Sequence, residues 1–208
     1  MFFEPHHLYH IYNQGNNGQK VFFNRDHYLF FRRKLKNHIL PFADILAWCL
    51  MPNHFHLMVH VNNVEIDEKL IIPGCKSGRD SESHPDLQRI TLNKSIGIML
   101  ASYTRAINKQ KGWSGSLFRK ETKAVCLTRS DGISPAWYTM QGITSIDVPD
   151  PLHEYPNICY RYILCNPVHA GLVSDAMDWE FSSCREIMKS CKDVLINAKR
   201  IEYYGLEF

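Results

Sequence analysis

The stretch MPNHFHLMV, residues 51–59, decides how this sequence folds and where its chemistry lies. A Pro-Asn break precedes an apolar run, which predicts a strand that enters from a tight turn. Side chains alternate between the two faces of a strand, so His54 and His56 point one way while Phe55 points the other. Two imidazoles on one face of a rigid strand can hold a divalent cation. The same spacing is common in strands whose histidines bind no metal, so a metal site requires a further ligand from elsewhere in the chain.

A candidate partner lies near the end of a predicted helix, which covers residues 152–165 and stops at Asn166-Pro167. Tyr162 and Asn166 are four residues apart, and on a helix such side chains lie one above the other. Tyr160 points about 200° away from Tyr162, since successive helical residues turn by about 100°. A phenol and a carboxamide beside two imidazoles suit the cutting of a phosphodiester. The alternative is structural, with Tyr162 as a half-buried core aromatic and Asn166 as a helix cap before Pro167.

The composition is that of a globular protein from a reducing compartment. The 208 residues are 45% hydrophobic and 12% aromatic, which supports a substantial core. The formal net charge of +3 is compatible with a nucleic-acid partner without being diagnostic of one. The seven cysteines form no Cys-x-x-Cys pair, so we expect reduced thiols and a cytoplasmic location. The N-terminal residues show neither a signal peptide nor a transmembrane run, so no membrane association is expected.

Strand and helix signals alternate along the chain, and two polar segments interrupt them. The order β-α-β-β-α-β predicts a ferredoxin-like (RRM-like) α+β fold, in which helices pack on one face of an antiparallel sheet. We expect a single domain over residues 1–208, with loop insertions at 62–87 and 129–151. The fold alone does not assign a function. The predicted elements are strand 8–12, helix 26–40, strands 42–50 and 54–61, helix 88–111, a strand that ends near Leu127, and the closing helix 152–165.

Several of these segments together resemble one known family. The sequence is similar to the single-tyrosine HUH transposases, named for their His-hydrophobic-His motif, and specifically to the REP-associated tyrosine transposases. The resemblance covers most of the chain, and the motifs occur in the family's order. They are YHIYN at 9–13, AWCLMPNHFHL at 47–57, SYTR at 102–105 with Asn108, GSLF at 115–118, YI at 162–163, NPV at 166–168, AGLV at 170–173, Trp179 and Ser182-Ser183.

The resemblance implies an enzyme that cleaves and rejoins DNA through a 5′-phosphotyrosine. In that interpretation His54 and His56 bind the metal, Asn166 supplies the third protein ligand, and Tyr162 is the nucleophile. The metal would be Mg²⁺ or Mn²⁺, and the sequence does not choose between them. The implied substrate is single-stranded DNA, often beside a hairpin. Relatives are often dimers, so a homodimer is expected, in which Tyr162 acts either within its own chain or on the other subunit.

Basic residues near the motifs are candidate DNA contacts, although most charges on a helix face are only solvated. Trp113 and Phe118 either stack on bases or pack in the core. The chain also departs from the family. Gln14 stands where relatives often have Arg, and RKETK at 119–123 replaces the usual sequence after Phe118, so DNA recognition is expected to differ. The candidate phosphate contacts are Arg105, Arg119, Lys120 and Lys123.

Three functions fit these residues. The first is an active transposase that nicks and transfers single DNA strands. The second is a domesticated, non-cutting nucleic-acid-binding protein, against which the intact metal and nucleophile residues argue, because binding alone does not need them. The third is a nickase of the replication-initiation or relaxase type, which uses the same chemistry but is usually larger. A metal protein unrelated to DNA would need a third histidine or a carboxylate, which the sequence patterns do not place.

Overall fold

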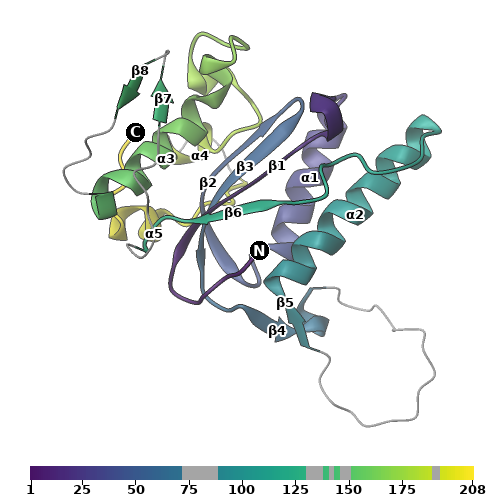
Figure 1. Cartoon of the computed structure of the whole chain (residues 1–208), viewed down its shortest axis with the longest axis horizontal. Helices are drawn as coiled ribbons and strands as arrows, with labels where there is room; N and C mark the ends of the chain where they lie inside the picture. Colours follow the sequence, from purple (N-terminus) through teal and green to yellow (C-terminus); the bar gives the residue numbers. More distant parts are fainter. Residues whose placement is uncertain (72–88, 130–137, 141–142, 146–150, 189–192) are drawn as a thin grey trace.

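A four-stranded antiparallel sheet in the order β2-β3-β1-β6 forms the centre of the molecule (Figure 1). Helix α1 (Arg25–His38) follows β1, and α2 (Leu92–Lys111) precedes β6, so the chain has the element order and strand arrangement of a ferredoxin-like fold. The predicted fold class is therefore confirmed. The four strands are β1 (Leu8–Gln14), β2 (Ala43–Met51), β3 (His54–Val61) and β6 (Lys123–Cys126).

This computed structural model describes residues 1–71, 89–129, 138–140, 143–145, 151–188 and 193–208. The predicted insertions at 62–87 and 129–151 fall largely outside these residues.

No described helix has the length and apolar character needed to cross a membrane, and every described cysteine is a free thiol. The smaller elements are the paired strands β4 (Glu65–Asp67) and β5 (Arg89–Thr91), the paired strands β7 (Tyr138–Met140) and β8 (Ile143–Ser145), the 3-10 turns η1 (Asn16–Gly18), η2 (Glu68–Leu70) and η3 (Ala176–Asp178), and the short helices α4 (Cys184–Ile187) and α5 (Ala198–Tyr203).

Helices α1 and α2 cover one face of the sheet. Asn24 caps α1, because its side chain accepts a hydrogen bond from the backbone N–H of His27 (3.1 Å). Phe55 of β3 enters this face and meets Phe31 of α1 at 5.2 Å between ring centroids. Phe31 in turn lies 5.1 Å from Tyr103 of α2, and all three rings are fully buried. The apolar set of alternating β3 residues therefore builds the main core with the two crossover helices.

Helix α3 (Pro151–His169) covers the opposite face of the sheet (Figure 1). The prediction that the helices share one face is therefore wrong for this element. Tyr160 and Ile163 of α3 are fully buried in one cluster with Cys49 of β2 and Met58 of β3. Since this second face of the sheet is also apolar, a covering layer is needed to keep it from water.

Helix α3 also runs further than predicted, beyond Asn166-Pro167 to His169. Pro167 has no N–H and gives up one helical hydrogen bond, but the N–H of Ala170 still donates to the carbonyl of Asn166 (3.0 Å). The helix ends before Gly171, whose φ of +66° is that of a left-handed cap. Asn166 consequently lies inside the helix, one turn after Tyr162, and does not act as its cap.

The segment after α3 runs along β2 and covers the edge of the sheet. The backbone N–H of Ser183 donates to the carbonyl of Trp48 (2.8 Å). The buried carboxylate of Glu186 in α4 accepts a hydrogen bond from Arg32 of α1 (2.9 Å). An uncovered edge strand is a template for pairing with other chains, so this segment protects the edge of the sheet. The contact of Arg32 with Glu186 also connects the C-terminal segment to α1.

Replacing Phe31 with alanine should lower the free energy of unfolding by about 3–5 kcal/mol, because a fully buried ring leaves a cavity. Urea unfolding followed by circular dichroism measures the change. Phe2 is 74% exposed, so Phe2→Ala is the control and should change stability by no more than about 0.5 kcal/mol. Equal losses in the two variants would contradict the core described above.

Candidate active site

The turn that precedes the two histidines is held in place by the segment after β1. The backbone N–H of Gly15 donates to the carbonyl of Asn53 (2.8 Å), and that of Val21 donates to the carbonyl of Pro52 (2.8 Å). A Cβ atom on Gly15 would lie 2.1 Å from the carbonyl oxygen of Gln19, so this close approach requires glycine. The first residue of β3 therefore leaves a turn whose position is fixed.

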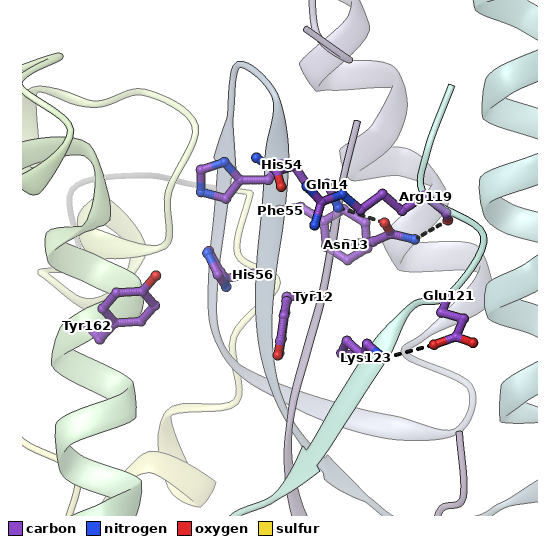
Figure 2. A pocket seen from close by; sticks show the side chains of 10 residues that line it. All are labelled: Tyr12, Asn13, Gln14, His54, Phe55, His56, Arg119, Glu121, Lys123 and Tyr162. Atoms are coloured by element: carbon purple, nitrogen blue, oxygen red, sulfur yellow. Dashed lines mark hydrogen bonds and ion pairs between the residues drawn. The ribbon is translucent and has the colours of Figure 1, made fainter. Parts of the chain in front are cut away.

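The pairing of β1 with β3 decides which side chains share the face covered by α3. Tyr12 lies opposite His56, and Gln14 lies opposite His54. Residues directly opposite on antiparallel strands point to the same face, so the two histidines share it with the polar end of β1. A pocket of about 440 Å³ opens at this place (Figure 2). It is lined by Tyr12, Asn13, Gln14, His54, Phe55, His56, Arg119, Glu121, Lys123 and Tyr162.

Helix α3 brings Tyr162 and Asn166 to the two histidines. His54 Nε2 lies 3.2 Å from Asn166 Oδ1, and the ring centroids of His56 and Tyr162 are 5.3 Å apart. Figure 2 shows the Tyr162 hydroxyl directed toward the two imidazoles. Tyr162 is 41% exposed, whereas Tyr160 is fully buried. The tyrosine that lies four residues before Asn166 is therefore the accessible one of the two. The four residues predicted as metal ligands and nucleophile thus come together within one chain.

The hydrogen-bond partners of His54 show that this donor set fits a cation. His54 Nδ1 lies 2.6 Å from Asn53 Oδ1, and Nε2 lies 3.2 Å from Asn166 Oδ1. A neutral imidazole has one N–H, and both partners are oxygens that only accept. With the proton on Nδ1, at the shorter contact, the lone pair of Nε2 would face an oxygen lone pair. A cation between them removes this repulsion, and neighbouring ligands of a six-coordinate ion at about 2.1 Å lie about 3 Å apart.

The candidate set of metal ligands in the pocket is small. Within the described ranges, no three side chains of His, Cys, Asp or Glu form a metal-binding group. The candidate donors are the imidazoles of His54 and His56 and the amide oxygen of Asn166. So small a protein ligand set would leave positions for water and for phosphate oxygens, and because imidazole is a ligand of several divalent metals the donor set does not select one.

Burial sets the protonation of these groups. It lowers the pKa of His54 and of His56, so both imidazoles are neutral at neutral pH and have a lone pair to offer. Burial raises the pKa of Tyr162, while a hydrogen bond with Asn166 acts to lower it. Asn166 therefore lies close enough to act on both Tyr162 and His54.

His10 belongs to this site, although the sequence patterns did not single it out. Its Nε2 lies 2.8 Å from His56 Nδ1, and its ring centroid is 6.4 Å from that of Tyr162. Burial lowers the pKa of His10 to about 4. The one available signal was the alternation of His10 and Tyr12 on the first strand, which places both side chains on one face.

The predicted DNA contacts divide into two groups. Arg119 and Lys123 line the pocket, and exposed Lys120 lies between them in sequence. Lys123 also forms an ion pair with Glu121 (2.8 Å, Figure 2). Arg105 is not among the residues that line the pocket, and it lies on α2, whose buried residues pack in the main core on the other face of the sheet.

The two candidate stacking residues also differ. Phe118 is buried in the main core, so its ring packs within the protein and offers no face to a base. Trp113 is 49% exposed, and its ring meets Phe23 edge-on at 5.4 Å between centroids. Of the two, only Trp113 remains accessible to a ligand.

Comparison with known proteins gives a structural relative and no sequence relative. No family profile and no curated protein matches the sequence. A solved structure described as a REP-associated tyrosine transposase bound to a REP hairpin matches 95% of this chain and 92% of its own, with a TM-score of 0.54 and 13% sequence identity. This chain has the fold of that transposase. The likeness concerns the fold, so the roles of individual residues rest on the geometry of the pocket.

Removing either imidazole should weaken Mn²⁺ binding in the absence of DNA. We expect His54→Ala and His56→Ala each to raise the dissociation constant at least about 10-fold, because even second-shell changes have effects of this size. Electron paramagnetic resonance of free Mn²⁺ measures the constant. His169→Ala, which removes an exposed imidazole at the end of α3, should have no effect. Unchanged binding in both pocket variants would place the ion elsewhere.

Proposed function

We propose that this protein is a metal-dependent tyrosine transposase, which cleaves and rejoins single-stranded DNA beside a hairpin. The observation that carries the proposal is an accessible phenol, Tyr162, held beside the donor set of His54, His56 and Asn166. The fold shared with a tyrosine transposase bound to a REP hairpin supports it. A protein that only binds DNA needs a basic surface, but it does not need this arrangement.

In the proposed reaction Tyr162 attacks a phosphodiester of the DNA. Its Oη forms a bond to phosphorus while the bond from phosphorus to the 3′ oxygen breaks. The phenol releases one proton to water, and the departing 3′ oxygen takes up one proton to become a hydroxyl. The fragment that begins at the break stays on Tyr162, joined through its 5′ phosphate as a phosphotyrosine ester. Attack on this ester by another DNA 3′-hydroxyl joins two strands and regenerates the phenol, so no ATP is needed.

The residues around Tyr162 prepare the phosphate and the phenol. His54, His56 and Asn166 would hold the metal, which when bound neutralises nonbridging phosphate oxygens and orients the phosphorus for in-line attack. The Asn166 hydrogen bond acts against the burial that raises the pKa of Tyr162, and so favours loss of the phenolic proton. The amide thereby serves both the ion and the nucleophile.

The rim of the pocket suits the backbone of a DNA strand. Arg119 and Lys123 supply positive charge there, and contacts of this kind hold a strand in register without reading its bases. Gln14 lines the same pocket where relatives often carry arginine. We propose that the strand crosses this rim to reach Tyr162, and that the sequence preference differs from that of the relatives.

We propose that Tyr162 acts in cis. The contact between Asn166 and His54 and the packing of Tyr162 on His56 are both made within one chain. A homodimer, which the resemblance suggests, is then not required to complete the site.

Tyr162→Phe should abolish a covalent protein–DNA adduct. The assay uses labelled single-stranded hairpin DNA from the gene's own flanks, Mn²⁺ and a denaturing gel. Tyr160→Phe is the matched control, because this tyrosine lies on the same helix but is fully buried, and the adduct should persist. Tight DNA binding without any adduct in the unmodified protein would favour the non-cutting binder.

Mixing two inactive variants tests cis action. Tyr162→Phe lacks the nucleophile and His56→Ala lacks a ligand, so a site built within one chain gains nothing when they are combined. The mixture should therefore show no adduct above that of either variant alone. Recovery toward one quarter or more of the normal adduct yield would show that the tyrosine is supplied in trans.

A further inference from the structure

The contact between His10 and His56 has a definite geometry. On the paired strands β1 and β3, His10 lies opposite Met58, two residues beyond His56. Its side chain reaches diagonally across the ladder, so that His10 Nε2 lies 2.8 Å from His56 Nδ1. The rings are nearly parallel, with centroids 5.0 Å apart and an angle of 27°.

This contact decides which nitrogen of His56 can bind a cation. Nδ1 faces His10, so Nε2 is the nitrogen that remains for the pocket. Figure 2 shows one ring nitrogen of His56 directed toward His54 and the hydroxyl of Tyr162. A coordinating nitrogen carries no proton, so the single proton of neutral His56 must be on Nδ1. His10 Nε2 must then be the acceptor.

We propose that His10 is a positioning residue of the metal centre, which accepts a hydrogen bond from His56 Nδ1–H and thereby fixes both the tautomer and the orientation of that ligand. The inference rests on the proposed function, because it assigns His10 a role toward the same ion. His54 has the corresponding arrangement, since its Nδ1 is 2.6 Å from Asn53 Oδ1. Partners of this kind commonly orient metal-binding histidines.

Two other roles for His10 fit the geometry less well. As a third ligand it would have to direct a nitrogen at the ion, yet its Nε2 faces Nδ1, the nitrogen of His56 that lies away from the pocket. As a packing residue it would serve no better than an apolar side chain, and the same face already uses buried Leu8 and Met58 for that purpose.

Two substitutions separate hydrogen bonding from packing. His10→Gln keeps an acceptor oxygen near His56, while His10→Leu fills similar space without one. ¹⁵N-detected NMR of the metal-free protein reports the His56 tautomer, and electron paramagnetic resonance reports Mn²⁺ affinity. We expect the Nδ1–H tautomer in the unmodified protein, a mixture of tautomers and about 10–100-fold weaker Mn²⁺ binding in His10→Leu, and substantial rescue in His10→Gln.

Tyr204→Phe is the matched control. Tyr204 contacts His60 Nδ1 (2.7 Å) on the same face of β3, outside the pocket, so its loss should leave Mn²⁺ affinity unchanged. Normal Mn²⁺ binding in a folded His10→Leu variant, or an Nε2–H tautomer in the unmodified protein, would overturn the role of His10. Failure of the unmodified protein to bind Mn²⁺ or to form an adduct would instead overturn the proposed function, whichever tautomer His56 adopts.

Discussion

The register of β3 against β1 is the constraint on which the rest of the site depends. Pairing of Asn13 with Phe55 sends the Phe55 ring into the core beneath α1 and α2, and the alternation of side chains then sends His54 and His56 to the other face. A slip of one residue would exchange the two sets and bury the imidazoles among aromatic rings. The hydrophobic packing of one face therefore holds the polar groups of the other in position.

The polar face holds a pair of atoms that a cation would bridge. With its proton on Nδ1, His54 presents the lone pair of Nε2 to the amide oxygen of Asn166 at 3.2 Å. In the proposed account a divalent ion converts this contact into coordination. Metal binding would then stabilise the folded chain as well as prepare the phosphate for Tyr162.

The parts of the site that follow local periodicity could be predicted from the sequence. The two histidines share a face because strands have a period of two, and the tyrosine meets the asparagine because helices bring residues four apart together. His10 could not be found in this way, because its contact with His56 crosses 46 positions and depends on strand register. Pro167 gave a false stop signal because the true cap is Gly171. Arg105 lies outside the pocket, which the sequence could not show because the apolar pattern of a helix does not say which face of a sheet it covers, and its contact with DNA stays a prediction.

Tandem mass spectrometry of the covalent product tests the central claim most directly. The protein would react with hairpin-flanked single-stranded DNA and Mn²⁺, the DNA would be trimmed by nuclease, and the modified tryptic peptide would be sequenced. The account predicts a nucleotide joined through its 5′ phosphate to Tyr162 and to no other residue. A nucleotide on Tyr12, which lines the same pocket, or cleaved DNA without any modified tyrosine, would contradict it.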